Sequence, residues 1–216
     1  MGTITAIQPQ RRRGRFNILV DGVFKIAVSE KVVVDQKLAV GRDLDEAKLT
    51  ETALAEDRQK ALASALRLLE SRPRSEREIT DRLKQRDCTP ETITAVIQKL
   101  REHGFVDDVQ FTAAWIESRA RTQPGGRYKL KQELIEKGIA KSTIDEAIGE
   151  ISEDTEIELA KKALSKRSAT IPADKDERRA AYARDVAYLA RRGFTWTIAK
   201  PVLNERYGQS IDDYEE

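Results

Sequence analysis

The stretch SEREITDRLKQRDCTPETITAVIQKLREHGFVDDVQFTAAW, residues 75–115, decides the fold of this chain. It opens with a capping box, because Ser75 and Glu78 have the spacing at which each side chain can bond the backbone amide of the other. Thr89 followed by a proline marks a second helix start, since proline at the first helical position gives up no needed donor. Gly104 is placed to end that helix in a left-handed conformation. The stretch therefore predicts short helices joined by tight turns, which can bury their apolar faces only by packing together.

A third helix follows within the same stretch. Asp107 and Gln110 can cap it, and it carries Phe111, Ala114 and Trp115. Trp115 lies one turn beyond Phe111 on the apolar stripe of this helix. We therefore predict that Trp115 anchors a hydrophobic core and is not a binding residue.

The same module recurs twice further along the chain. In each copy a leucine precedes a helix end and a turn, a cysteine or apolar residue follows five positions later, and an isoleucine of the next helix comes after that. The three sets are Leu83/Cys88/Ile93, Leu134/Ile139/Ile144 and Leu189/Phe194/Ile198. The first two copies, beginning at Ser75 and Gly126, are 51 residues apart, whereas the third copy is spaced more loosely. Three copies at such a period indicate a tandem array of three-helix repeats.

The first forty residues differ in kind, because apolar and polar residues alternate on both sides of Asp21 and Gly22. This pattern predicts a β-hairpin. A two-residue loop would pair Ile18 with Lys25. A three-residue loop with Gly22 in the left-handed region pairs Ile18 with Phe24 and gathers the apolar side chains on one face, and we favour this register.

Two further strands are expected at residues 3–7 and 31–34, which makes a small antiparallel sheet. A run of arginines stands at the first turn of this sheet: Arg11, Arg12, Arg13 and Arg15. A solvated turn is the interpretation we favour for this run, and a contact with phosphate or an acidic partner is the alternative.

The apolar residues change from a period of about two to a period of about 3.6 residues after Gly41, and this change together with the repeats sets the expected domain boundaries. Residues 1–42 form the β-hairpin region, 43–106 a helical linker with the first repeat, 107–152 the second repeat, and 153–216 the third repeat with an acidic tail. Helices in the second and third repeats are expected at residues 111–119, 127–137, 142–151, 156–166, 176–192 and 195–205. The fold class is therefore mainly α.

The composition suits an elongated array with much surface and thin cores, because hydrophobic residues make up only 39% of the 216 residues and charged residues 35%. A formal net charge of +2 does not by itself indicate nucleic-acid binding. A single cysteine excludes an intramolecular disulfide and fits a reducing cytosol. No apolar run approaches the roughly 18 residues of a membrane span, and no secretion signal is visible. We therefore expect a cytoplasmic protein without a membrane partner.

A search for catalytic chemistry finds little. The lone histidine, His103, stands beside a helix end, where it complements the helix dipole. Cys88 occupies a core turn position matched by Ile139 and Phe194 in the other copies. The sequence shows no metal-ligand spacing and no phosphate-binding loop. We therefore predict a protein that is not an enzyme and takes no cofactor and no metal.

The most distinctive charge feature is the segment RARTQPGGRYKLK, residues 119–131. It contains no acidic residue, and its cations are Arg119, Arg121, Arg127, Lys129 and Lys131. Proline and paired glycines make its middle a loop, and cations at the start of the next helix oppose the macrodipole of that helix. We therefore predict that this segment contacts phosphates or an acidic protein surface, with Tyr128 interleaved, and a solvated loop is the alternative.

A second basic point, Arg191 with Arg192, precedes Gly193. It is a further candidate for partner contact. Its position at a helix C-terminus also allows simple complementation of the helix dipole, which is the plainer interpretation.

Several of these segments resemble one known family, the RecX regulators of the RecA recombinase. The resemblance rests on RSEREITDRL, on TPETITAVIQKLREHGFVDDVQFTAAWIESR, on GGRYKLKQELIEKGIAKSTIDEAI, more loosely on YLARRGFTWTIAKPVLNE, and on the N-terminal hairpin RFNILVDGVFKIAV. It implies three tandem three-helix repeats in a curved, elongated shape.

Membership of that family would also imply a partner. The expected partner is the RecA–DNA filament, whose ATPase and strand exchange the protein would modulate, usually by inhibition, in DNA repair and the SOS response. Weak binding to free DNA and a monomeric state are further expectations. The third repeat departs most from the family pattern, so contacts made there are the least transferable.

Two other classes of function stay open. A helix-turn-helix transcription regulator is one, because residues 75–104 resemble a two-helix unit ending in a turn. Its recognition helix would offer only Lys99 and Arg101 as cations, which is poor for a duplex groove. A general helical scaffold without a nucleoprotein partner is the other.

Overall fold

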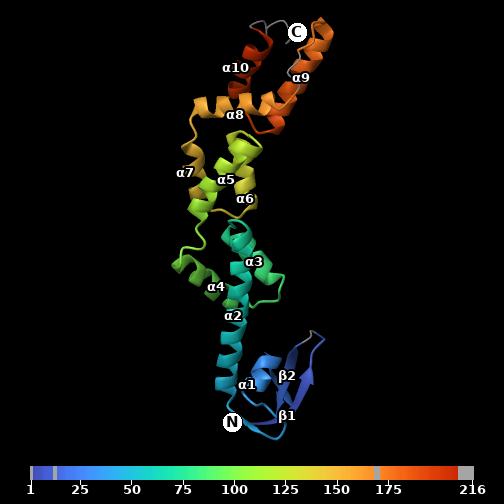
Figure 1. Cartoon of the computed structure of the whole chain (residues 1–216), viewed down its shortest axis with the longest axis vertical. Coiled ribbons are helices and arrows are strands. Elements are labelled where there is room, and N and C mark those ends of the chain that lie inside the picture. Colours follow the sequence, from blue (N-terminus) through green and yellow to red (C-terminus); the bar gives the residue numbers. More distant parts are fainter. Residues whose placement is uncertain (1, 12–13, 168–170, 209–216) are drawn as a thin grey trace. The chain divides into compact units, whose positions relative to one another are not determined.

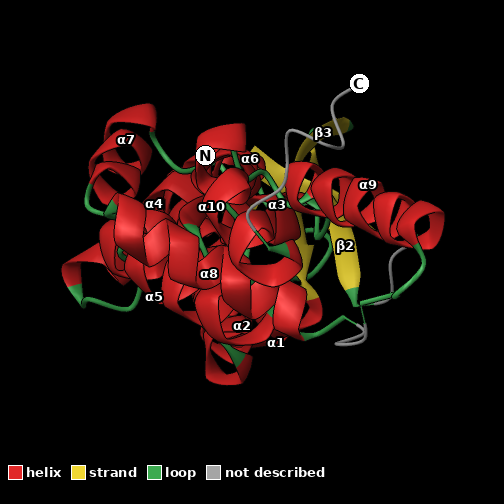
Figure 2. Ribbon diagram, turned by 90° about the horizontal axis from the view of Figure 1, so that it is seen from above, coloured by secondary structure: helices red, strands yellow, loops and turns green. Residues whose placement is uncertain are grey.

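The computed structural model describes residues 2–11, 14–167 and 171–208. Helices dominate it, and the strands lie in the N-terminal segment (Figures 1 and 2). Its contacts form two compact units. The first unit comprises residues 1–72 and 80–103, and the second comprises 73–79 and 104–216. The acidic tail and two of the N-terminal arginines, Arg12 and Arg13, lie outside the described residues.

The first unit contains a four-stranded antiparallel sheet with the strand order β3-β2-β1-β4. The strands are β1 (Gly2–Pro9), β2 (Arg15–Val20), β3 (Val23–Ser29) and β4 (Asp43–Leu44). The strand predicted at residues 31–34 is wrong, because this segment belongs to helix α1 (Glu30–Asp35). Ser29 caps that helix by accepting a hydrogen bond from the amide of Val32, and Val32 is buried among the apolar residues of the sheet. This local cap outweighs the strand preference of three consecutive valines.

The hairpin register that we favoured is also wrong. Asp21 and Gly22 both have positive φ angles, 49° and 82°, which makes a two-residue turn between Val20 and Val23. A bulge then inserts one extra residue in β3, so that Ile18 pairs with Ile26. Ile18 is fully buried in this register, whereas Phe24, which the favoured register placed on the same apolar face, is 55% exposed.

One long helix, α2 (Glu46–Ser71), follows the sheet and is capped by Asp45, whose side chain accepts a hydrogen bond from the amide of Lys48. The repeat helices come after it. They are α3 (Glu76–Lys84), α4 (Pro90–Glu102), α5 (Asp108–Thr122), α6 (Arg127–Glu136), α7 (Lys141–Gly149), α8 (Glu153–Ser165), α9 (Lys175–Arg191) and α10 (Trp196–Tyr207). The predicted mainly helical fold with a small N-terminal sheet is confirmed.

The predicted caps are present. The Ser75 hydroxyl accepts from the amide of Glu78 at 3.3 Å, and the Glu78 carboxylate accepts from the amide of Ser75 at 3.4 Å. Thr89 and Asp107 cap α4 and α5 through their side-chain oxygens. These local hydrogen bonds satisfy amides that the first turn of a helix leaves without partners.

The recurring leucine pattern has one structural meaning in all three copies. The amide five residues after each leucine donates to that leucine's carbonyl: Cys88 to Leu83 at 3.2 Å, Ile139 to Leu134 at 3.1 Å, and Phe194 to Leu189 at 3.1 Å. The residue before each donor has a positive φ, and it is Asp87, Gly138 and Gly193 in turn. This is the Schellman motif, and it ends α3, α6 and α9 alike. All three leucines are fully buried.

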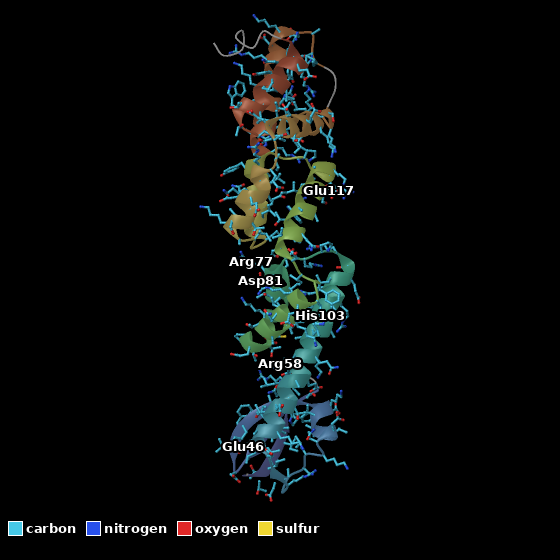
Figure 3. The ribbon with its side chains drawn as sticks, turned by 90° about the vertical axis from the view of Figure 1, so that its left-hand side faces the viewer. Glu46, Arg58, Arg77, Asp81, His103 and Glu117 are labelled. Atoms are coloured by element: carbon cyan, nitrogen blue, oxygen red, sulfur yellow. The ribbon has the colours of Figure 1, made fainter. Side chains whose placement is uncertain are left out.

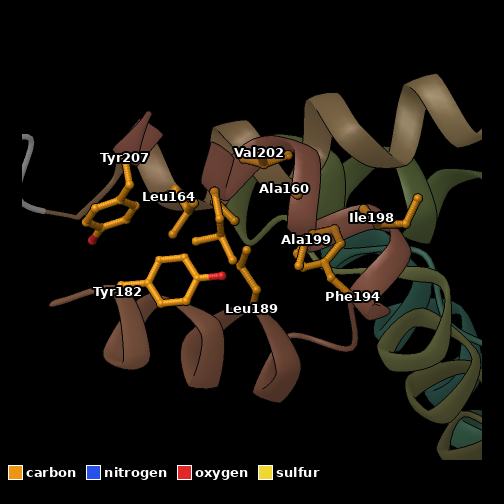
Figure 4. Packing of buried hydrophobic residues seen from close by; sticks show 11 residues of the cluster. Ala160, Leu164, Tyr182, Leu189, Phe194, Ile198, Ala199, Val202 and Tyr207 are labelled. Carbon is orange, nitrogen blue, oxygen red and sulfur yellow. The ribbon is translucent and has the colours of Figure 1, made fainter. Parts of the chain in front are cut away.

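The third repeat has its own core between α8, α9 and α10. Tyr182 and Leu189 of α9 point toward Leu164 of α8 and toward α10 (Figure 4). Beside this core, Asp185 is only 4% exposed, and its carboxylate pairs with the guanidinium groups of Arg167 at 2.9 Å and Arg206 at 3.3 Å.

Trp115 takes the predicted place beside the core of the second repeat. Its ring stacks on Phe111 with the centroids 5.8 Å apart, and it packs against the buried cluster around Leu134. The indole is only partly buried, and its N–H donates to the Glu133 carboxylate at 3.1 Å. Trp115 therefore anchors the rim of this core, with its polar atom satisfied.

Candidate functional site

The start of helix α6 lies against the Schellman turn that ends α9, and this contact is made by backbone atoms. The amide of Gly126 donates to the carbonyl of Arg192 at 2.9 Å. A Cβ atom on Gly126 would come within 2.3 Å of the Gly193 carbonyl oxygen, so only glycine permits this approach. The negative end of one helix dipole therefore meets the positive end of the next.

Arg127, the first residue of α6, does not face solvent as a free cation. A carboxylate from α8, that of Glu156, accepts a hydrogen bond from the Arg127 amide at 2.8 Å and lies 3.2 Å from the Arg127 Nε. Glu156 is 3% exposed, and Arg127 also donates to the carbonyl of Ile151. The sequence argument that cations here oppose the helix dipole without local compensation is wrong for Arg127, because a buried acid supplies the compensation.

Two more of the predicted contact residues are held in ion pairs within the second unit. Arg119 pairs with Glu133 at 2.7 Å and lies over the Trp115 ring, 4.3 Å from its centroid. Lys131 pairs with Asp145 at 2.6 Å. The hydrogen bond from Lys131 lowers the pKa of the Asp145 carboxyl below its ordinary value.

The remaining predicted contacts differ, because within the described residues no ion pair forms with Arg121, Lys129 or Arg191. Arg121 and Arg191 are exposed and Lys129 is half-buried. Arg192 donates to the carbonyl of Pro124 at 3.3 Å, and its guanidinium carbon lies 5.2 Å from the centre of the Tyr188 ring. These contacts orient Arg192 without neutralising its charge.

Lys129, Arg191 and Arg192 come together where α6 meets the end of α9, and we call this group the basic junction. A Cβ atom on Gly193 would lie only 2.6 Å from the Cβ of Lys129, which places the lysine stem directly beside the Schellman turn. Arg121 lies near the end of α5 and is not a member of the basic junction.

An equivalent junction between α6 and the first turn of α3 shows what the basic junction lacks. There the Ser75 hydroxyl donates to the carbonyl of Lys137 at 2.7 Å, and the Lys137 ammonium pairs with Glu78 at 2.7 Å. Lys137 is the C-cap of α6 as Arg192 is the C-cap of α9. Lys129 stands 51 residues after Glu78, at the matching position of α6. An acid–base pair at one junction therefore becomes two cations at the other.

Two neighbouring like charges create a positive potential that attracts anions. No cluster of metal-ligating side chains occurs in the part of the chain that the structure describes. The arrangement is suited to binding phosphate or carboxylate groups. Sequence reasoning missed Glu133 and Glu156, since each lies at least 14 residues from the arginine it neutralises.

Among the described residues, no helix is long and apolar enough to cross a membrane.

Comparisons with known proteins agree along most of the chain. Three family models match: the RecX N-terminal domain at residues 2–45, the first RecX three-helix domain at 61–100, and the second at 107–148. A regulatory protein RecX of Clostridium tetani (strain Massachusetts / E88) is 30% identical over 203 residues, which covers 94% of this chain and 93% of that protein. A regulatory protein RecX of Limosilactobacillus reuteri (strain DSM 20016) is 32% identical over 166 residues, which is 77% of this chain but only 63% of that longer protein.

A solved structure agrees as well. A crystal structure of regulatory protein RecX has 28% sequence identity and a TM-score of 0.60, and the match covers 94% of this chain and 98% of that one. A crystal structure of RecX from Lactobacillus salivarius, at 22% identity and a TM-score of 0.62, shares the fold over 70% of this chain. The chain therefore belongs to the RecX family of regulatory proteins.

Proposed function

We propose that this protein is a non-enzymatic regulator that binds the RecA recombinase filament on DNA and restrains its ATPase and strand exchange during DNA repair and the SOS response. We further propose that it acts as a cytoplasmic monomer with weak affinity for free DNA. Membership of a family of regulatory proteins supports this proposal. The single observation that carries it is the basic junction, where two cations replace an acid–base pair.

The predicted contact residues fall into two groups under this proposal. Lys129, Arg191 and Arg121 are available to meet phosphates or acidic side chains of the filament, and Arg192 adds its charge to the basic junction. The other three predicted contact residues have structural pairs and contribute indirectly: Arg119, Arg127 and Lys131. Exposed charges of the first group act mainly by raising the association rate, so that binding weakens with salt.

Co-sedimentation with RecA filaments tests the proposal. The triple variant Arg121→Glu/Lys129→Glu/Arg191→Glu should bind filaments at least roughly tenfold more weakly, because three favourable contacts of about 0.5–1 kcal/mol each are lost. The matched control Lys162→Glu/Lys175→Glu/Lys200→Glu changes net charge equally on α8, α9 and α10 of the same unit.

Equal binding by the contact variant and the wild-type chain, with both folded, would show that these cations are a solvated face. Equal weakening in the control would show that only net charge matters. Sedimentation with DNA alone, in parallel, separates filament recognition from simple DNA binding and also tests the transcription-regulator alternative.

A further inference from the structure

The first unit contains a cavity of about 470 Å³. None of the residues of the basic junction lines it. It lies between the sheet, helix α2 and the turn that joins α3 to α4. Its walls include Lys60, Ser64, Arg86 and Cys88 together with the Arg15–Asp57 ion pair. A cavity of this volume is large enough for a small molecule of metabolite size.

The repeat pattern explains why this cavity exists. Cys88 occupies the position that holds Ile139 and Phe194 in the other two repeats, and those two side chains are 6% and 5% exposed. Cysteine is much smaller than either residue, and Cys88 is only half-buried. The first repeat therefore lacks the larger apolar side chain that fills this position in the other two repeats.

An unsatisfied polar group lines the same cavity. Ser64 is 4% exposed, and its hydroxyl has no hydrogen-bond partner among the described residues. A buried hydroxyl without a partner is energetically costly, so folded proteins contain few of them. A polar ligand atom in the cavity would supply the missing partner.

The charges around the cavity favour an anion. Asp57 is already neutralised, since its two carboxylate oxygens lie 3.2 Å and 3.3 Å from the two terminal nitrogens of Arg15. Lys60 bonds Glu56 at 2.9 Å but keeps 58% of its side chain exposed. Arg86 also lines the wall, as does the start of α4, where Thr89 and Thr92 lie. The wall thus carries three cations, Arg15, Lys60 and Arg86, against two acids, Asp57 and Asp87, and Glu56, which bonds Lys60, is not among the lining residues.

We propose that this cavity binds a small molecule through a carboxylate or phosphate group, which accepts a hydrogen bond from the Ser64 hydroxyl and is attracted by Lys60 and Arg86. The thiol of Cys88 forms the wall beside the bound group. This inference is independent of the filament-binding proposal, because it concerns the first unit and none of the residues of the basic junction.

Cys88 is the sole cysteine of the chain, so its alkylation reports on the cavity without interference. Iodoacetate carries a carboxylate and iodoacetamide does not. In both reactions the thiolate sulfur bonds to the CH₂ carbon, iodide leaves, and the thiol proton passes to the buffer. A cavity that selects oxyanions should raise the rate with iodoacetate relative to iodoacetamide by roughly tenfold over the same ratio in the urea-unfolded chain.

Variants with matched controls locate the selectivity. Lys60→Gln and Arg86→Gln should each lower the rate ratio several-fold. Arg58→Gln on α2 and Arg82→Gln on α3 remove neighbouring cations that do not line the cavity, and they should leave the ratio unchanged (Figure 3 shows Arg58). A rate ratio equal in the native and unfolded chain would overturn the proposal, as would equal losses in the controls. A thiol that neither reagent reaches would also overturn it, because the cavity would then be closed.

Competition identifies the anion. Inorganic phosphate and citrate, each compared with chloride at constant ionic strength, should slow iodoacetamide alkylation if they occupy the cavity. Protection by phosphate alone identifies a phosphate ligand, and protection by citrate alone identifies a carboxylate ligand. Ser64→Ala should weaken whichever protection is seen. Absence of protection by both anions, or protection unchanged in Ser64→Ala, would contradict the proposed site.

Discussion

The two junctions within the second unit share a backbone arrangement and differ in charge. At both, the Schellman turn that ends one middle helix lies against the start of another, through Lys137 and Ser75 in one case and through Arg192 and Gly126 in the other. At the first junction Lys137 is paired with Glu78 at 2.7 Å and Arg77 lies beside the turn at Gly138, whereas the second junction presents Lys129 and Arg192 with no acid at the position of Glu78. The difference teaches that this repeat architecture keeps a Schellman turn against the start of another helix while the contacting donor changes, from the Ser75 hydroxyl to the Gly126 amide, and the surface charge changes with it.

The largest expected effect comes from forcing the second junction to resemble the first. Gly126→Ser installs the residue found at the equivalent Ser75, yet its Cβ would lie 2.3 Å from the carbonyl oxygen of Gly193. Because the obstructing atoms are backbone, we expect a loss of about 3 kcal/mol in the free energy of unfolding. Chemical denaturation of this variant beside Gly149→Ser measures it, since a Cβ on Gly149 meets nothing within 4 Å. If the two variants were equally stable, the second junction would have to accommodate a side chain at position 126, as the first accommodates Ser75.

The next largest effect concerns Glu156, the buried acid that contacts Arg127 at the second junction. Glu156→Gln removes the charge that caps the Arg127 amide and pairs with its guanidinium. We expect a loss of about 1.5–2 kcal/mol, because a charge-assisted hydrogen bond is replaced by a neutral one. Glu158→Gln is the control, as its side chain is 71% exposed on the same helix. If both variants unfolded at the same denaturant concentration, Arg127 would have to be regarded as a free cation after all.

A charge exchange tests the comparison directly. Lys129→Glu should create at the second junction the pair that the first one has, and so raise stability by up to about 1 kcal/mol at low salt while weakening filament binding. Glu78→Lys should lower stability, because it removes both a cap and an ion pair. Thermal unfolding in low and high salt follows both changes. Destabilisation by Lys129→Glu at low salt would indicate that Lys129 and Arg192 do not share one electrostatic site.

The smallest effect separates Lys131 from the basic junction. The folded pKa of Asp145 lies below its ordinary value because Lys131 donates a hydrogen bond to it. The stability that this pair contributes is therefore present above the unfolded pKa and is lost as pH falls through the folded pKa. Carboxyl chemical shifts measured through an acid titration should show the Asp145 pKa rising toward normal in Lys131→Gln and unchanged in Lys129→Gln. If the pKa of Asp145 were unchanged in Lys131→Gln, Lys131 would not be paired with Asp145 and would have to be counted among the cations available to a partner.

Local features of this fold could be predicted from the sequence, and distant pairings could not. Caps such as Ser75 with Glu78 act within four residues, and the spacing from Leu83 to Cys88 is itself the signature of a Schellman turn, so both are visible in one stretch. The bulge in β3 and the helix at residues 30–35 depend on packing against other segments. Distant partners are also what the sequence argument for the candidate site lacked, while the site itself stays a proposal. The run at residues 119–131 contains no acid, yet Glu133 and Glu156 reach it from further along the chain.

The backbone contact between Gly126 and the turn at Gly193 has a consequence for how this family can diversify. A joint made of amides and carbonyls does not depend on which side chains surround it, apart from the glycines that permit the approach. Substitutions at neighbouring positions such as Lys129 can therefore accumulate without altering the angle at which successive helices meet. The helix-to-helix contact and the surface charge at this joint are thus carried by different atoms, so the charge can change by side-chain substitution alone.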